Sequence, residues 1–181
     1  MTNDKNTNGP RARAGCSNDR HKSEQGNRSN SPPQNQPIPI SLPAERSVLG
    51  ALIEDDSLLP EVIAAGLRAE DFALSDHRRV FTAILFLCEQ KSPVDYITVT
   101  EQLGNRQEDY VLAGSLIHGV VLHEDHVLHH VAIVRRKARL RALLRIAEWI
   151  TRVVADSADP DALIEQTIAK LEAVASAEVT A

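Results

Sequence analysis

The most constraining feature of this sequence is the run from Glu124 to Asp156, which contains neither glycine nor proline. Because those two residues interrupt helices, their absence permits one helix of about 48 Å, at about 1.5 Å per residue. The pattern equally allows one break that folds the run into a hairpin. Apolar residues recur along it as a stripe, which must meet another helix or a second subunit in so small a protein. The candidate self-association residues in this stripe are Val127, Val131, Val134, Leu140, Leu143, Leu144 and Ile150.

Polar caps and helix breakers predict shorter helices on both sides of this run. The expected caps are Ser41, Asp56 with Ser57, Ser75, and Asp95 or Thr98. Gly66 and Gly104 are expected to end helices, because glycine adopts the left-handed conformation of a helix C-terminus. A short helix is expected near 108–117 and a last one over 161–176. No segment has a convincing strand pattern, so the sequence predicts an all-α protein.

The stretch EDFALSDHRRVFTAILFL, residues 70–87, permits two interpretations. Asp76 and His77 beside two arginines resemble a catalytic or metal-binding cluster. The alternative is the first turn of a buried helix, where an aspartate is favoured by the helix dipole. We favour the second, since an apolar stripe follows at helical spacing. This interpretation predicts that Cys88 is a buried thiol, that Phe81 stabilises the core, and that replacing His77 by alanine costs little.

Composition narrows the class of protein. Hydrophobic residues make up 43% of the chain but aromatic residues only 3%, which suits a core of packed helices better than a β-sandwich. Cys16 and Cys88 are too far apart to suggest a disulfide framework, which indicates a reducing cytoplasm. The chain shows no secretory signal and no apolar run of about 18–20 residues that would span a membrane. We therefore expect a cytoplasmic protein that makes no membrane contact.

Residues 1–37 differ from the rest of the chain. They contain no Val, Ile, Leu, Phe, Tyr or Trp, and six Lys or Arg against three Asp or Glu give them a charge of +3. Because such a segment cannot bury enough apolar surface to order itself, we expect a disordered polar tail. It is either a weak nucleic-acid or partner arm or, the interpretation we favour, a solubilising leader. The expected folded domain spans 38–156, and a linker-like helix with the C-terminal end spans 157–181.

Signatures of catalysis are lacking in the sequence. None of the eight glycines is followed by lysine, so a P-loop for phosphate binding is absent, as is the dinucleotide fingerprint. A group of five histidines could in principle hold zinc or perform acid–base chemistry beside Asp125: His118, His123, His126, His129 and His130. Since there is no HExxH motif, nearby cysteine or nucleophile, we interpret them as exposed. We predict no catalytic residue, cofactor or metal.

Basic residues follow the histidines along the same run. The possible partner or nucleic-acid face consists of Arg135, Arg136, Arg139, Arg141 and Arg145. The simpler interpretation, which we favour, is a solvated helix face. No aromatic residues alternate with these arginines, which argues against a platform for stacking single-stranded bases.

Four segments in series resemble the N-terminal domain of the DnaB-type replicative DNA helicase: PAERSVLGALIED, LRAEDFALSDHRRVFTAILFL, SPVDYITVTEQL and HHVAIVRRKARLRALLRIAEWI. The resemblance runs from about Ser41 to Ala155, and residues 160–176 look like the start of that family's linker helix. It implies an all-helical globular head followed by a long helical hairpin. The family's RecA-like motor domain has no counterpart in this sequence.

The resemblance also implies a role. In that family this domain hydrolyses nothing; hairpins pair into dimers that assemble as a hexameric collar, and the domain helps to recruit primase. We therefore expect a non-enzymatic module of DNA replication that is a homo-oligomer, either dimer or hexamer. Its expected partners are a replicative helicase, a DnaG-type primase or both, with DNA met only indirectly or weakly. The alternatives are a small nucleic-acid-binding protein, using the basic tail and the Arg135–Arg145 helix face, and a metalloenzyme built on the histidines.

Overall fold

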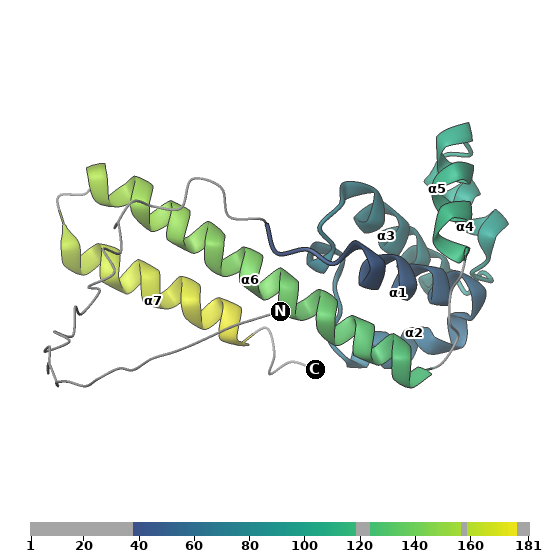
Figure 1. The fold of residues 1–181 in the computed structure, drawn as a ribbon, viewed down its shortest axis with the longest axis horizontal. Helices are drawn as coiled ribbons and strands as arrows, with labels where there is room; N and C mark the ends of the chain where they lie inside the picture. The colour runs from purple at the N-terminus through teal and green to yellow at the C-terminus, as the bar shows by residue number, and fades with distance from the viewer. Residues whose placement is uncertain (1–37, 119–123, 157–158, 177–181) are drawn as a thin grey trace, which may run out of the picture. The chain divides into compact units, whose positions relative to one another are not determined.

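The computed structural model describes residues 38–118, 124–156 and 159–176. Within these ranges the regular structure is entirely helical, as the sequence predicts (Figure 1). The predicted polar tail, residues 1–37, lies outside the described residues. The helices, with two short 3-10 turns labelled η, are α1 (Leu42–Glu54), η1 (Asp56–Leu58), α2 (Leu59–Ala64), η2 (Ala69–Asp71), α3 (Ser75–Glu89), α4 (Tyr96–Leu103), α5 (Gln107–Ile117), α6 (Glu124–Asp156) and α7 (Pro160–Ser176).

Helix α6 decides between the two alternatives left open for the long run, because it is a single helix over its whole length. Its N-terminal half packs against α1, α2 and η2, and its C-terminal half runs beside α7 (Figure 1). We call α1 to α5 together with the N-terminal half of α6 the head. The C-terminal half of α6 and α7 form the hairpin.

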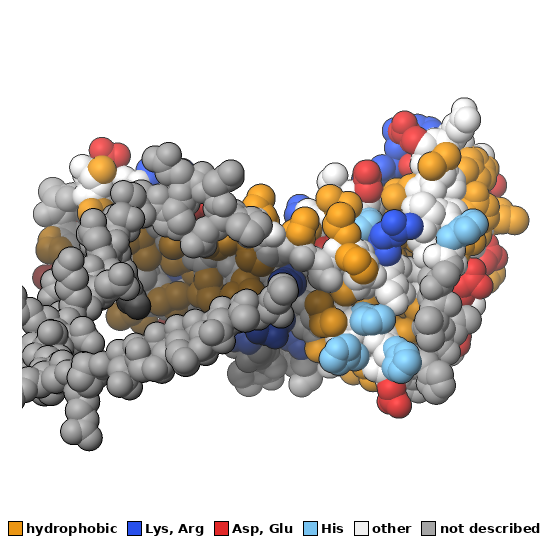
Figure 2. All heavy atoms as spheres, in the orientation of Figure 1, with side chains coloured by type: hydrophobic (Ala, Val, Ile, Leu, Met, Phe, Trp, Pro, Cys, Tyr) orange, Lys and Arg blue, Asp and Glu red, His pale blue; other side chains and the backbone are white. Residues whose placement is uncertain are grey.

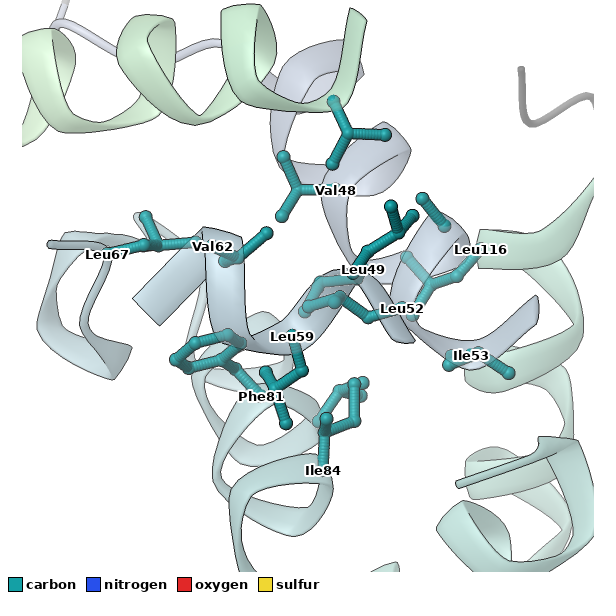
Figure 3. Close-up of a cluster of buried hydrophobic side chains, with 14 of the residues drawn as sticks. Val48, Leu49, Leu52, Ile53, Leu59, Val62, Leu67, Phe81, Ile84 and Leu116 are labelled. Atoms are coloured by element: carbon teal, nitrogen blue, oxygen red, sulfur yellow. The ribbon is translucent and has the colours of Figure 1, made fainter. Parts of the chain in front are cut away.

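Helix α1 is the centre of the head. Its residues 48–53 are buried almost all round, because α3, α5 and α6 each cover a different side of it. Figure 3 shows Leu49 and Leu52 of α1 near Leu116 of α5, and Val48 of α1 near Val62 of α2. A helix that is apolar on every side is stable only inside such a bundle.

Two phenylalanines anchor α3 in this core. Phe72 precedes the helix and Phe81 lies within it, and neither has exposed surface. Their ring centroids are 5.2 Å apart and the rings are tilted by 42°, a favourable aromatic arrangement. The stretch 70–87 is therefore a loop and a core helix, as one of its two interpretations predicted.

The helix α4 has the boundaries expected from its caps. The Asp95 carboxylate accepts hydrogen bonds from the backbone N–H groups of Ile97 and Thr98, each at 2.8 Å. Thr98 Oγ1 in turn accepts from the Asp95 N–H at 2.9 Å, which completes a capping box. Gly104 ends the helix with φ of 123°, a conformation that favours glycine.

Ser41 is the N-cap residue of α1 as predicted, although its side chain makes no cap hydrogen bond. Two other predicted caps are wrong. Helix α3 begins at Ser75 itself, so that Leu74 occupies the cap position. Before η1 the capping oxygen comes from Asp55, which accepts from the Ser57 N–H at 3.1 Å. In these two cases the boundary lies one residue earlier in the chain than predicted, a shift that local propensity cannot anticipate.

Cys88 is exposed, so the prediction of a buried thiol is wrong. The buried positions in the second half of α3 are Ala83, Ile84 and Leu87. Because Leu87 takes the buried position of the last turn, the next residue points away from the core. The apolar stripe of α3 is therefore one residue shorter than the sequence pattern suggests.

Candidate interaction surfaces of the hairpin and the head

The apolar stripe of α6 serves two different purposes along its length. Val127, Val131 and Val134 are buried in the core of the head, where they pack against α1. Leu140 and Leu143, in contrast, are 39% and 43% exposed. We therefore restrict the proposed self-association surface to the C-terminal part of the stripe, since the three valines have no surface to offer.

Leu144 and Ile150, the remaining candidates of this stripe, are half-buried. Both lie on the stretch of α6 that runs beside α7. Lys170 of α7 places its ammonium 4.7 Å from the centroid of the Trp149 ring of α6, a cation–π contact that helps to hold the two helices together.

A groove lies between α6 and α7 in the hairpin. It has a volume of about 270 Å³ and is lined by Arg136, Arg139, Leu140, Leu143, Leu171, Val174 and Ala175. Five of these seven lining side chains are aliphatic, and the other two are arginines of α6. Hydrophobic side chains are visible along the hairpin in Figure 2.

Helix α7 extends this apolar surface. Ile164, Ile168 and Leu171 recur at spacings of four and three residues and therefore share one face of the helix. All three are at least 41% exposed. Large aliphatic side chains gathered on one exposed surface indicate a binding site, because isolated soluble chains rarely present such a patch to water.

The five candidate arginines of α6 do not form one face. Arg135 donates from Nη1 to the carbonyl oxygen of Ala65 at 2.5 Å, and Arg141 donates to the carbonyls of Pro39 and Asp71. Those two side chains fasten α6 to the head. Arg136 and Arg145 are exposed, while Arg139 is half-buried along the hairpin groove. The surface available to DNA is therefore smaller than the sequence suggests.

The histidines at the start of α6 are not arranged around a common point. His130 Nδ1 lies 2.9 Å from the hydroxyl of Ser47 in α1, and the rings of His129 and His130 meet edge-on at 6.2 Å. Burial lowers the pKa of His130, and the neighbouring His129 and His126 lower it further. His118, directly after α5, donates from Nδ1 to the Gly114 carbonyl, and His123 lies outside the described residues. The described parts of the chain contain no group of three metal-ligating side chains.

Glu45, which the sequence analysis did not single out, is buried in the first turn of α1. Its Oε1 accepts from the backbone N–H of Ala73 at 2.9 Å, and its Oε2 lies 2.7 Å from Nδ1 of the equally buried His77. The low exposure of His77 does not fit the expectation that it can be replaced at little cost. The available signal was a lone carboxylate inside an apolar helix, which needs a buried partner.

A second ion-pair network joins the outer helices of the head. Asp109 of α5 accepts from Arg79 of α3 at 3.1 Å and from Nε of Arg106 at 3.0 Å. The hydrogen bond from Arg106 lowers the pKa of Asp109. Across the described residues, every buried side-chain nitrogen or oxygen has a hydrogen-bond partner, so none of them is left to orient a ligand.

No helix within the described ranges is long and apolar enough to cross a membrane. The class that these features define is a helical domain with a packed head and an exposed apolar hairpin. The chain belongs to the family described as the DnaB-like helicase N terminal domain, whose sequence profile matches residues 37–136.

Similar proteins agree with this assignment. The replicative DNA helicase DnaB of Geobacillus stearothermophilus is 32% identical over 118 residues, which cover 63% of this chain and 26% of the helicase. The replicative DNA helicase DnaC of Bacillus subtilis is 31% identical over 125 residues, 67% of this chain and 26% of the helicase. The chain thus spans about a quarter of the length of these curated relatives, which is the part that carries the N-terminal domain.

The fold has a solved counterpart. The crystal structure of the N-terminal domain of DnaB helicase from Mycobacterium tuberculosis matches with a TM-score of 0.68 and 26% identity. The match covers 75% of this chain and 99% of that one. The resemblance inferred from the four sequence segments is thereby confirmed, as is the all-helical fold.

Proposed function

We propose that this chain is an interaction module of DNA replication that associates with itself through the hairpin and contacts a replicative helicase, a primase or both. It acts by binding, without an ATPase site of its own. The observation that carries the proposal is the exposed aliphatic surface of α6 and α7, on a chain of the DnaB-like N-terminal domain family.

The physical argument is one of unburied apolar area. Removing such surface from water contributes roughly 25 cal/mol per Å². Leu140 and Leu143 on α6 and Ile164, Ile168 and Leu171 on α7 are all large, aliphatic and exposed. A second copy of the hairpin would cover this aliphatic surface with an identical one, because a two-fold interface brings the same patch from both subunits together.

The charged rim of the surface is compatible with such pairing. Arg136 and Arg139 border the hairpin groove, and α7 carries Glu165 and Glu172. Arginine stems can lie along apolar surface while the guanidinium groups remain hydrated or meet carboxylates. Charges of both signs at the rim would favour one register of two hairpins over others.

The first test is the mass of the protein by light scattering after size exclusion. A dimer or hexamer is expected for the natural chain. Replacing Leu143 by glutamate places a charge on the proposed surface and should shift the mass towards the monomer. The control is Ile97→Glu on α4, because Ile97 is an exposed apolar side chain of the head, at 64% against 43% for Leu143; this variant should leave the hairpin-mediated dimer intact. A natural chain that is monomeric at every concentration would contradict self-association.

The second test adds partners. The same measurement on mixtures with the replicative helicase and with a DnaG-type primase of the same organism should yield a mixed complex with at least one of them. Binding to neither would contradict the proposed role while leaving self-association untouched. Titration with duplex DNA distinguishes the nucleic-acid alternative, since that function predicts an affinity that falls steeply with salt.

A further inference from the structure

The segment before α3 is held by arginine side chains from two different helices, α3 and α6. Three consecutive carbonyl groups, those of Asp71, Phe72 and Ala73, each accept a hydrogen bond from an arginine. Arg78 of α3 donates to Phe72 and Ala73 at 2.8 and 3.0 Å, and Arg141 of α6 donates to Asp71 at 2.5 Å. These bonds satisfy backbone groups that no helix or strand could satisfy at this position.

Arg141 reaches a second segment as well. Its Nη1 donates to the carbonyl of Pro39, in the chain just before α1, at 2.9 Å. The side chain is half-buried, and burial lowers the pKa of its guanidinium, whereas the nearby Glu45 acts in the opposite direction. One residue of α6 thus links the start of the described chain to the loop that seats Phe72 in the core.

The position of Arg141 along α6 gives this contact its mechanical importance. The first attachment of α6 is the buried valine set centred on Val131. A long helix that is attached at only one short patch can change its angle relative to the rest of the head. Arg141 lies ten residues further along, about 15 Å from Val131 at a rise of about 1.5 Å per residue. Two attachments separated by that distance constrain the direction of the helix far more than one.

We propose that Arg141 fixes the direction in which the hairpin leaves the head, through its hydrogen bonds to the Pro39 and Asp71 carbonyls. The planar guanidinium suits this role, because its fork of N–H donors can bond two carbonyls from different segments at once. Arg135, bonded to the Ala65 carbonyl, lies between these two attachments. Because it is close to the valine set, it constrains the direction of the helix less than Arg141 does. The proposal concerns a single chain and does not depend on self-association.

The test is a distance distribution between two spin labels, measured by pulsed electron paramagnetic resonance. One label occupies the natural and exposed Cys88 on α3, with Cys16 changed to serine. The second occupies a cysteine in place of the exposed Glu148 near the end of α6. Labelled protein is mixed with an excess of unlabelled chain, so that only distances within one chain contribute.

The variant Arg141→Ala is expected to broaden this distribution and shift its mean, while circular dichroism shows unchanged helix content. Arg145→Ala, an exposed arginine one turn further on, is the matched control and should leave the distribution unchanged. If Arg141→Ala does not fold, Arg141→Lys provides the same readout, because a single ammonium cannot bond both carbonyls as a fork. A distribution as narrow as that of the natural chain in the folded Arg141 variant, or equal broadening by Arg145→Ala, would overturn the proposal.

Discussion

At the scale of single residues, the contact between Glu45 and His77 explains how a buried carboxylate is tolerated in the first turn of α1. Both oxygens of the carboxylate are used, one by the Ala73 N–H and one by the His77 ring. The edge of the Phe72 ring lies against His77, with centroids 6.5 Å apart, and closes the pocket around the pair. The two residues join α1 to α3 through a polar contact inside an apolar core.

A double-mutant cycle tests this pair. Glu45→Ala and His77→Ala should each lower the free energy of unfolding by about 1–3 kcal/mol, because each leaves a buried partner unsatisfied. The double variant should cost less than the sum of the two, by about 0.5–3 kcal/mol of coupling. Urea denaturation followed by circular dichroism measures all four proteins. Strictly additive losses would argue against the contact, and Glu54→Ala, on the exposed end of α1, is the control for surface carboxylates.

Phe81 and Phe86, both on α3, give a second comparison at this scale. Phe81 has no exposed surface, whereas Phe86, on the same helix, is 43% exposed. Phe81→Ala should therefore cost about 3–5 kcal/mol of stability through lost burial and the cavity left behind. Phe86→Ala should cost much less, since water already reaches its ring. Thermal or urea unfolding of both variants checks the difference; equal losses would mean that the core is not centred on Phe81.

At the scale of elements, α3 and α5 are joined by an ion pair between Arg79 and Asp109. Asp109 lies in the first turn of α5, where a carboxylate is also favoured by the helix dipole, and it has no exposed surface. Arg79 reaches it from α3, and Arg106 closes the start of α5 over it. The network fixes the end of the head that α4 and α5 form.

This network predicts a dependence of stability on acid. Hydrogen bonds from Arg106 and from Arg79 hold the pKa of Asp109 below its usual range. An unfolded aspartate titrates near about 3.9, so the stabilisation is complete above that pH and is lost as the pH falls through the lower folded pKa. Melting temperatures between about pH 5 and pH 3 should fall less steeply for Asp109→Asn than for the natural chain. Identical slopes would assign the acid sensitivity to other carboxylates; Asp95, whose pKa is also lowered, contributes to both proteins.

At the scale of the whole molecule, the balance of packing differs between the two ends of α6. The head has a complete apolar core around α1, to which α3, α5 and α6 all contribute. The hairpin has only two helices, and α7 has no fully buried residue. The two helices leave part of their apolar surface exposed, and under the proposed function a second copy of the hairpin covers it.

This imbalance predicts that stability depends on concentration. If copies pair through the hairpin, the midpoint of thermal unfolding should rise with protein concentration, because association stabilises only the folded chain. Leu143→Glu should abolish the rise, and its midpoint should equal that of the natural chain at high dilution. A midpoint independent of concentration over the micromolar range would contradict pairing through this surface. Differential scanning calorimetry at several concentrations provides the measurement.

Local patterns were sufficient for much of the fold. The absence of glycine and proline in 124–156 allowed the long helix, and Asp95 and Gly104 marked α4 at both ends. These features act within one or two helical turns, so that the sequence alone contains the physics that decides them. The four segments in series likewise indicated the family from the sequence alone.

Tertiary structure decided which residues those helices bury and which they present. Val131 and Leu143 belong to one stripe in the sequence, yet the first is covered by α1 and the second is exposed. Arg141 and Arg145 are chemically alike, yet only the first meets backbone carbonyls of the head. The reason is physical: helical periodicity follows from local backbone geometry, whereas the burial of each face depends on contacts between residues far apart in the chain.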